Sequence, residues 1–200
     1  MLVPPGFRRS EIEPLLQRQA RWLLKHWLVP SRPPVPPRAF VAGESFSYLG
    51  QDYLLTFTTA TRRPQVTLGG NELWLSLNPN HHTAVEIRRL LIDWYRVKAA
   101  ELLTARLNHW APVVGAAPTD LRLKEFKTRW GYCRRDGLIA LNWRIVQASL
   151  PVIDYLVVHE LSHLLHPHHQ PAFWTAVAEV IPDYRDRRSW LRMHGAELIW

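Results

Sequence analysis

The sequence His-Glu-Leu-Ser-His at residues 159–163 is the part of this 200-residue chain whose residue types and spacing best fit catalysis. On a helix, His159 and His163 lie four residues apart on one face, so their imidazoles can bind a single metal ion. Glu160 follows directly after the first histidine and can reach a water molecule bound to that metal. We therefore predict a Zn²⁺ site with His159 and His163 as ligands and Glu160 as the general base.

A catalytic zinc site usually has three protein ligands and one open position, so a third ligand must come from another part of the chain. His169 follows His163 by six residues. Pro167 disfavours helical geometry at the residue before it, which should end the helix and let the chain fold back towards the metal. We therefore prefer His169 as the third ligand. Three other side chains of a suitable type remain alternatives: His166, His168 and Glu179.

The residues around this motif predict a buried helix. The run 151–165 is apolar on nearly all sides, Ser149 can cap it, and Pro151 is permitted in the first turn. Ionisable side chains on a buried helix are costly unless they are paired or bind a metal. The ordinary alternative, two helix histidines that make only hydrogen bonds, is therefore the weaker interpretation.

The proposed chemistry also needs groups that assist the metal site. Four residues are candidates for the donor that stabilises the oxyanion: Arg129, Tyr132, Tyr155 and His194. Tyr155 precedes His159 by four residues and shares its helix face. Asp154 is a candidate for orienting a ligand histidine. The strand predicted at 138–142 is a candidate edge of the cleft, to which an extended peptide could add.

Other residues with metal-binding side chains have less favourable contexts. His81 and His82 precede a predicted helix and have no partner at ligand spacing, so we interpret them as exposed loop histidines. Cys133 is the single cysteine, and no histidine at ligand spacing accompanies it. We interpret it as structural.

Period-two alternation of apolar residues predicts strands in two parts of the chain. Between residues 40 and 77, two hairpins are expected, one with a type II′ turn at Gly50–Gln51 and one turning at 69–71. Together they predict an antiparallel sheet of three or four strands with one buried face. A further hairpin is expected over 121–142, turning at Asp136–Gly137.

Helical patterns account for most of the remaining sequence. A long helix should begin at the capping box Thr83–Glu86 and end at Pro112 and Gly115. Two more helices are predicted over 170–181 and in the tail 183–200. We therefore expect an α+β fold, with an antiparallel sheet packed against helices and the motif helix buried at the centre.

The N-terminal residues read as an appendage to this domain. A helix is predicted over 10–29, and five prolines within 30–37 predict a polyproline-type spacer. We therefore expect an N-terminal segment at 1–37 and the main domain at 38–200.

Composition narrows the classes of function. No stretch approaches about 18 consecutive apolar residues and the start lacks a secretory signal, so no membrane association is expected. One cysteine fits a reducing compartment, and we expect a cytoplasmic protein. The net charge of +8 allows a nucleotide or nucleic-acid partner, but the basic residues are scattered without a run of five or six. The sequence does not predict an oligomeric state.

Several motifs, taken in order, resemble the YgjP-like zinc metallopeptidase family and, more loosely, SprT-like and other zincins. The resemblance runs from about Phe40 to the C-terminus and is strongest in four segments: Lys127–Cys133, Leu141–Arg144, Val152–Tyr155 and His159–Trp174. The family pattern has a histidine shortly before a Phe-Trp pair, which maps onto His169. The chain departs from the pattern at Tyr132, His168 and Gln170, none of which is a preferred ligand.

This resemblance implies a zincin-like fold and a zinc-dependent peptidase acting on a peptide or protein. Two alternatives stay open. One is a metal-dependent hydrolase of nucleotides or other phosphoanhydrides, which the basic charge would suit. The other is a DNA-associated protease of the SprT-like kind.

Overall fold

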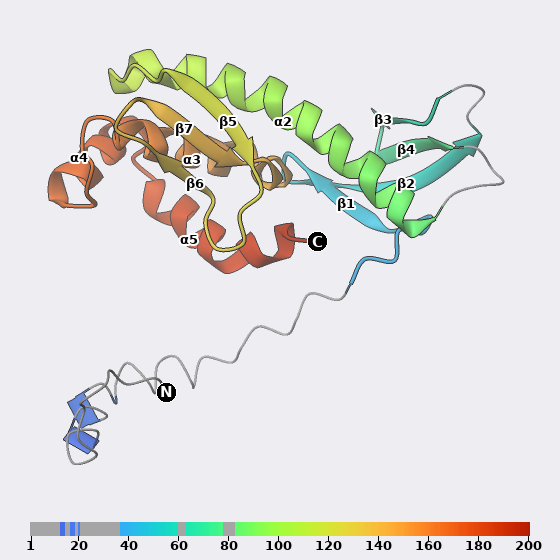
Figure 1. Ribbon diagram of the computed structural model, residues 1–200, viewed down its shortest axis with the longest axis horizontal. Helices are drawn as coiled ribbons and strands as arrows, with labels where there is room; N and C mark the ends of the chain where they lie inside the picture. The colour runs from blue at the N-terminus through green and yellow to red at the C-terminus, as the bar shows by residue number, and fades with distance from the viewer. Residues whose placement is uncertain (1–12, 15–16, 19, 21–36, 60–62, 78–82) are drawn as a thin grey trace. The chain divides into compact units, whose positions relative to one another are not determined.

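The computed structural model (Figure 1) describes residues 13–14, 17–18, 20, 37–59, 63–77 and 83–200. The chain divides into two units, Met1–Pro36 and Pro37–Trp200. In the first unit the described residues are helical, as predicted for 10–29. The rest of that predicted helix, most of the proline-rich spacer, and His81 and His82 lie outside the described residues.

Four strands form the first sheet of the second unit: β1 (Ser45–Tyr48), β2 (Gln51–Thr59), β3 (Gln65–Gly69) and β4 (Glu72–Leu77). Their order is β1-β2-β4-β3, with antiparallel pairing at both ends and parallel pairing between β2 and β4. The prediction of an antiparallel sheet is therefore wrong at its centre. Alternation predicts which face of a strand is buried, not which strand is its neighbour. β4, with every second residue buried, takes the central place, while the largely exposed β3 lies at the edge.

The first hairpin turns one residue earlier than predicted. Leu49 and Gly50 both have positive φ, 53° and 78°, which is a type I′ turn rather than type II′. Their amides donate to the carbonyls of Val146 and Gln147, at 2.8 and 3.2 Å. Contacts with a distant segment therefore decide the turn type. The second hairpin turns at Gly70 as expected.

The long helix α2 (Ala84–Val114) starts with the predicted capping box, in which Thr83 and Glu86 bond to each other's backbone. It does not end at Pro112, which is accommodated inside the last turn. Gly115 ends it with φ of 75°, in the left-handed region. Figure 1 shows α2 running past both sheets, and its buried residues enter the cores of both.

Three strands form the second sheet, in the order β5-β7-β6: β5 (Asp120–Lys124), β6 (Gly131–Cys133) and β7 (Leu138–Asn142). β5 is parallel to β7, so the hairpin predicted between them over 121–142 is wrong. The turn at Asp136–Gly137 instead joins β6 to β7. β6 has only three residues and no apolar alternation, so it carried no strand signal. β7 is buried at all five residues and takes the centre.

Four helical segments follow the short helix η1 (Trp143–Gln147): α3 (Leu150–Ser162), α4 (Pro171–Val180), α5 (Tyr184–His194) and η2 (Gly195–Leu198). α3 covers most of the run predicted at 151–165 and is buried along nearly its whole length. It ends at Ser162, before the predicted end at 165, because the next amides bond to carbonyls only three residues back. Leu164 donates to Leu161 and Leu165 donates to Ser162, which is the pattern of tight turns. Ser149 occupies the cap position without a side-chain cap bond.

The C-terminal residue Trp200 joins the two cores. Its indole ring makes edge-on contacts with Phe46, at 5.4 Å, and with Tyr95, at 5.8 Å. Its N–H donates to Gln147 at 2.8 Å, and its carbonyl accepts from the buried Arg144 at 3.0 Å. The fold is thus α+β. Among the described residues, no helix is both long and apolar enough to cross a membrane.

Candidate metal centre

Helix α3 and the segment after it bring three histidines together. His159 lies within α3, and His163 is the residue at which α3 ends. His169 approaches from beyond the helix, with its Nε2 3.1 Å from Nε2 of His159. One ring nitrogen from each of the three lies within 4.8 Å of the others. His159 and His163 are partly buried and His169 is exposed, so the group opens to solvent on one side.

The turn between α3 and α4 places His169. The amide of His166 bonds back to Ser162 at 2.9 Å, and the His166 carbonyl lies 3.3 Å from Nδ1 of His163. The chain then reverses, and the amide of Gln170 bonds to His168 at 2.7 Å before α4 begins. Of the alternative ligands, His166 and His168 do not join the three-histidine group. Neither does Glu179, which is exposed on α4.

An aromatic wall supports the histidines from α4. The Phe173 ring is fully buried, with its centroid 5.0 Å or less from all three histidine rings. Trp174 stacks on His169 at 5.3 Å and 18° and on Tyr184 at 5.3 Å and 14°. The rings therefore hold His169, the one ligand candidate outside α3, in a defined orientation.

The histidines favour the neutral form that binds metals. Burial, followed by the neighbouring charges, lowers the pKa of His159 to about 3. Burial also lowers the pKa of His163 and His169, and for the latter the charge of Arg188 adds to the effect. Zinc–nitrogen bonds of about 2.0–2.1 Å in a tetrahedron place ligand nitrogens about 3.3 Å apart, close to the separation found here for His159 and His169. Three neutral imidazoles so placed fit a Zn²⁺ ion.

Glu160 is a buried carboxyl group beside this cluster. Its residue is 4% exposed, and its Oε2 has no hydrogen-bond partner within the described structure. Burial raises the pKa of this carboxyl to about 8. Gly131 of β6 lies directly against it, because a Cβ added there would be 2.6 Å from Oε1. The carboxyl is thus held in place by packing and keeps a free acceptor atom.

Asp154 does not orient a ligand histidine. It accepts two hydrogen bonds from Arg106, at 2.6 and 2.9 Å, and a third from Trp110 at 2.9 Å. Its role is to fix α3 to α2. Nδ1 of His159 is buried without a partner among the described residues, so no carboxylate orients that ring.

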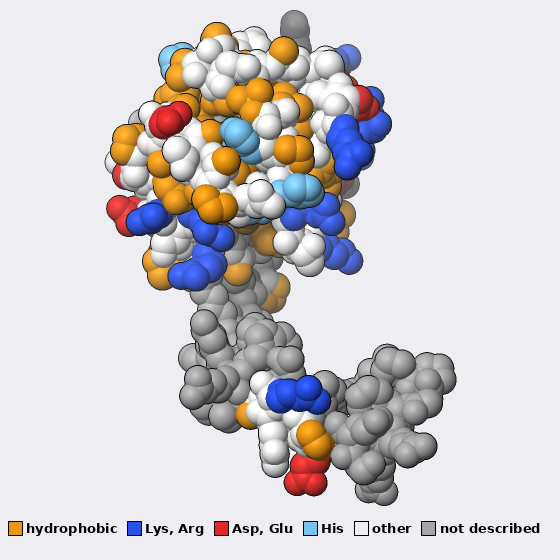
Figure 2. All heavy atoms as spheres, turned by 90° about the vertical axis from the view of Figure 1, so that its left-hand side faces the viewer, with side chains coloured by type: hydrophobic (Ala, Val, Ile, Leu, Met, Phe, Trp, Pro, Cys, Tyr) orange, Lys and Arg blue, Asp and Glu red, His pale blue; other side chains and the backbone are white. Residues whose placement is uncertain are grey.

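A cavity of about 290 Å³ adjoins His159 and Glu160. Besides these, it is lined by Trp130, which precedes β6, and by residues of β6, α3 and α5: Gly131, Tyr155, Leu156, Arg188, Leu191 and Arg192. Figure 2 shows the same end of the molecule, with histidine side chains set among hydrophobic ones and Lys or Arg side chains beside them.

Of the candidate oxyanion donors, Tyr155 lines this cavity, with its ring 5.7 Å from His159. Burial raises the pKa of Tyr155 to about 12, so its hydroxyl keeps its proton. Tyr132 packs on Phe126 instead, and His194 pairs with Glu197 at 3.2 Å. Neither of these two lines the cavity, nor does Arg129.

Sequence reasoning missed four cavity residues: Trp130, Gly131, Arg188 and Arg192. A signal existed for the arginines, because they are four residues apart on a predicted helix and so share a face. Trp130 and Gly131 lie in Lys127–Cys133, a segment that carries the family resemblance, but the contact of Gly131 with Glu160, 29 positions later, has no local pattern.

Comparison with known proteins identifies the family of the chain. A family model described as YgjP-like, metallopeptidase domain, matches residues 1–194. The chain belongs to the YgjP-like family. The match starts at the first residue, so it also covers the N-terminal segment that we placed outside the resemblance. Membership supports a metallopeptidase function and implies a metal, most often zinc in such enzymes, without assigning the ligands.

A solved metallopeptidase structure is similar to part of this YgjP-like chain. It is the metallopeptidase zymogen of Pyrococcus abyssi abylysin, which is 24% identical over 46% of this chain and 92% of that chain, with a TM-score of 0.42. No curated protein matches the chain.

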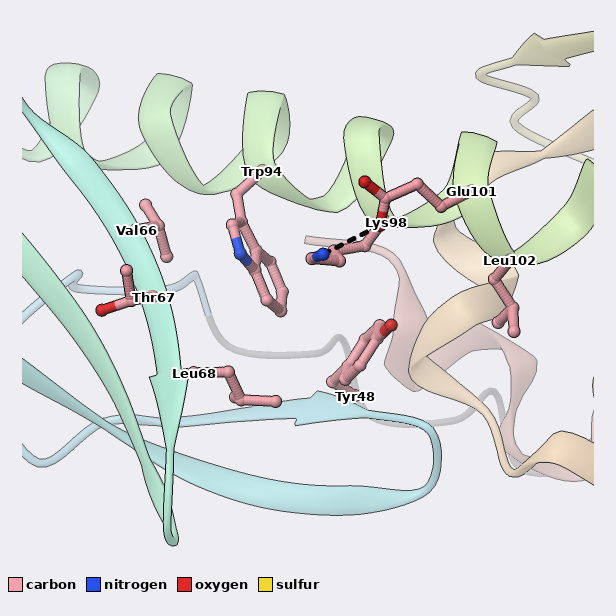
Figure 3. Close-up of a pocket in the computed structure, with 8 residues that line it drawn as sticks. All are labelled: Tyr48, Val66, Thr67, Leu68, Trp94, Lys98, Glu101 and Leu102. Carbon is pink, nitrogen blue, oxygen red and sulfur yellow. Dashed lines mark hydrogen bonds and ion pairs between the residues drawn. The ribbon is translucent and has the colours of Figure 1, made fainter.

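The YgjP-like domain has another hollow, between β3 and α2 (Figure 3). Its walls are mostly apolar, including Leu68 and Trp94, and its two charged groups, Lys98 and Glu101, pair with each other at 2.8 Å. It contains no histidine and no unpaired carboxylate. Among the described residues, the chemistry expected of a metallopeptidase is found at the three histidines.

Proposed function

We propose that this protein is a zinc-dependent metallopeptidase of zincin-like fold, in which His159, His163 and His169 hold Zn²⁺ and Glu160 is the general base. The observation that carries the proposal is the convergence of three ring nitrogens within 4.8 Å beside a buried carboxyl group with a free acceptor atom. The family membership supports the same function.

The residues of the chain have separate roles in this reaction. A zinc ion at the three histidines would supply a Lewis acid for the scissile carbonyl and a water of lowered pKa. Glu160 takes a proton from the attacking water and delivers it to the leaving amine. Tyr155 is the best-placed donor for the oxyanion, because its protonated hydroxyl belongs to a side chain that lines the same cavity.

The substrate in this proposal is an extended peptide that pairs with β6. We had expected the peptide to pair with the strand at 138–142. That strand, β7, cannot take this role, because β5 and β6 occupy both of its edges. β6 is an edge strand that pairs only with β7 among the described strands, and Gly131 brings it against Glu160. A peptide added to this edge would have its backbone aligned near the general base.

The test is metal analysis combined with peptide cleavage on matched variants. Glu160→Gln should retain zinc and lose turnover by several orders of magnitude, whereas His169→Ala should lose zinc. His168→Ala is the matched control, since His168 is an exposed neighbour outside the histidine group. Full activity in Glu160→Gln would disprove the assigned base, and normal zinc content in His169→Ala would disprove the third ligand.

One observation favours a second function, hydrolysis of a nucleotide or another phosphoanhydride. Arg188 and Arg192 line the same cavity as Glu160, and guanidinium groups bind phosphate well. Assay of the zinc-loaded protein against nucleoside triphosphates and unfolded protein, with and without chelator, separates the two functions. Chelator-sensitive release of phosphate or pyrophosphate without proteolysis would favour the second.

A further inference from the structure

Building on the peptidase function proposed above, we propose that Arg188 and Arg192 of α5 form a subsite for a carboxylate of the substrate, next to the scissile bond. The carboxylate is either an acidic side chain or the free C-terminus of a peptide. The enzyme would thus select acidic or C-terminal positions rather than cleave unfolded chains at random.

The placement of the two arginines supports a binding role. They are four residues apart on α5, so they share one face of that helix. Both line the cavity that holds His159 and Glu160. A substrate carbonyl at the metal and an anion at these guanidinium groups would therefore occupy the same cavity of about 290 Å³. This limits the anion to the residues immediately beside the scissile bond.

The charges of both arginines are available to a ligand. Within the part of the chain that the structure describes, neither Arg188 nor Arg192 forms an ion pair with a carboxylate. The other arginines of α5 differ. Arg187 pairs with Asp183 at 2.8 Å and donates to a backbone carbonyl of α3. Arg185 contacts the hydroxyl of Tyr184 and lines a different pocket.

Arg188 is also held in place before any substrate binds. Its guanidinium carbon lies 4.5 Å from the centre of the Trp174 ring, a cation–π contact. Trp174 in turn stacks on His169, so the cation and the ligand histidine share one aromatic support. A planar guanidinium fixed in this way can bind a carboxylate with two parallel hydrogen bonds.

A carboxylate is the anion that a peptide substrate offers. Glu160 is the one acidic side chain lining the cavity. In the proposed mechanism its carboxylate binds the attacking water, so it does not pair with the arginines. Placing a substrate acid beside the arginines compensates their charge, whereas a lysine at the same position would be repelled.

The experiment uses the full-length zinc-loaded protein and a series of otherwise identical peptides. The residue beside the scissile bond is Glu, Gln or Lys, and each peptide is made with a free and with an amidated C-terminus. The measured quantity is the ratio of kcat/KM between acidic and neutral peptides. We expect a ratio of roughly 10 to 100, the factor given by one or two charge-assisted hydrogen bonds. A preference for Glu over Gln indicates recognition of a side-chain acid. A preference for the free over the amidated C-terminus indicates recognition of a terminal carboxylate.

Variants then assign the preference to the two arginines. Arg188→Met and Arg192→Met should each reduce the ratio, and the double variant should bring it close to one. Arg188→Lys keeps the charge and should keep part of the preference. Arg185→Met is the matched control, with the same loss of charge on the same helix, and it should keep the full ratio.

The outcomes separate this inference from the function on which it rests. If no peptide is cleaved, the peptidase function fails, and the subsite fails with it. If peptides are cleaved without preference for a carboxylate, only the subsite is wrong. A preference that survives in the double variant would place carboxylate recognition elsewhere.

Discussion

Replacing Gly131 with alanine tests whether β6 positions the general base. In the present structure an added Cβ would lie 2.6 Å from Oε1 of Glu160, 2.9 Å from Cδ and 3.0 Å from Cγ. Ordinary contacts begin at 3.4 Å, so the carboxyl group must move by roughly 0.8 Å. A displacement of about 1 Å at a reacting group costs on the order of 100-fold in rate. We therefore expect kcat to fall about 100-fold in Gly131→Ala.

The same variant should keep its metal. The clash is with Glu160 and not with a histidine, so zinc stoichiometry should match that of the wild type. Overpacking of this kind typically lowers stability by about 1–3 kcal/mol, which leaves the chain folded. The assays are peptide cleavage, zinc analysis and urea denaturation on one preparation.

A matched control is available at Gly69, in strand β3. A Cβ there would meet only Trp74, at 3.8 Å, which is an ordinary contact. Gly69→Ala should therefore leave kcat unchanged. Wild-type kcat in Gly131→Ala would refute the assigned position of Glu160, and loss of zinc in that variant would show that the strand supports the metal ligands instead.

Three further predictions concern stability. Burial raises the pKa of Glu160 to about 8 from 4.5, so the folded metal-free chain retains a proton that the unfolded chain loses between these values. Glu160 should therefore contribute up to about 5 kcal/mol of stability at low pH, and the metal-free protein loses this contribution as pH rises from 4.5 to 8. The lowered pKa values of His159, His163 and His169 act in the opposite direction, so the measured quantity is the difference in unfolding free energy between wild type and Glu160→Gln across this pH range; a difference that does not change with pH would contradict the burial argument. Asp154→Ala leaves Arg106 unpaired between α2 and α3 and should lower the unfolding free energy by about 2 kcal/mol, whereas an unchanged denaturation midpoint would show that the ion pair contributes nothing. Trp200→Ala removes a ring shared by two cores and should cost about 3 kcal/mol in the same assay; a loss within experimental error would mean that the cores do not depend on it.

Local signals in the sequence predicted the helices well. The capping box at Thr83 and the left-handed end at Gly115 depend on neighbouring residues, and both are present. The prediction that Pro112 ends the helix was wrong, because a proline in the last turn removes only one backbone hydrogen bond of that helix. The early end of α3 depends on the turn that carries the chain to His169, and the apolar pattern contains no information about that turn.

The arrangement of strands could not be derived from the same signals. Alternation along β2 and β4 correctly marks their buried faces, but the parallel pairing of the two strands depends on the path of the chain between them. The same holds for β5 and β7. In the site, the spacing of the histidines identified the residues that the structure brings together, although their binding of zinc stays a prediction. Gly131 and Arg188 come from elements distant from α3 in the sequence, and only the folded chain shows that both line the cavity beside Glu160.

The long helix α2 has a consequence for cooperativity. Its 31 residues span roughly 46 Å, and its buried side chains belong to the core of the four-stranded sheet at one end and to the core around α3 at the other. Trp94 and Trp200 pack against both cores, so unfolding of the four-stranded sheet removes part of the packing around the core that contains α3. We expect the second unit to melt in one transition, so that a destabilising change in the sheet lowers the fraction of molecules with an assembled histidine group.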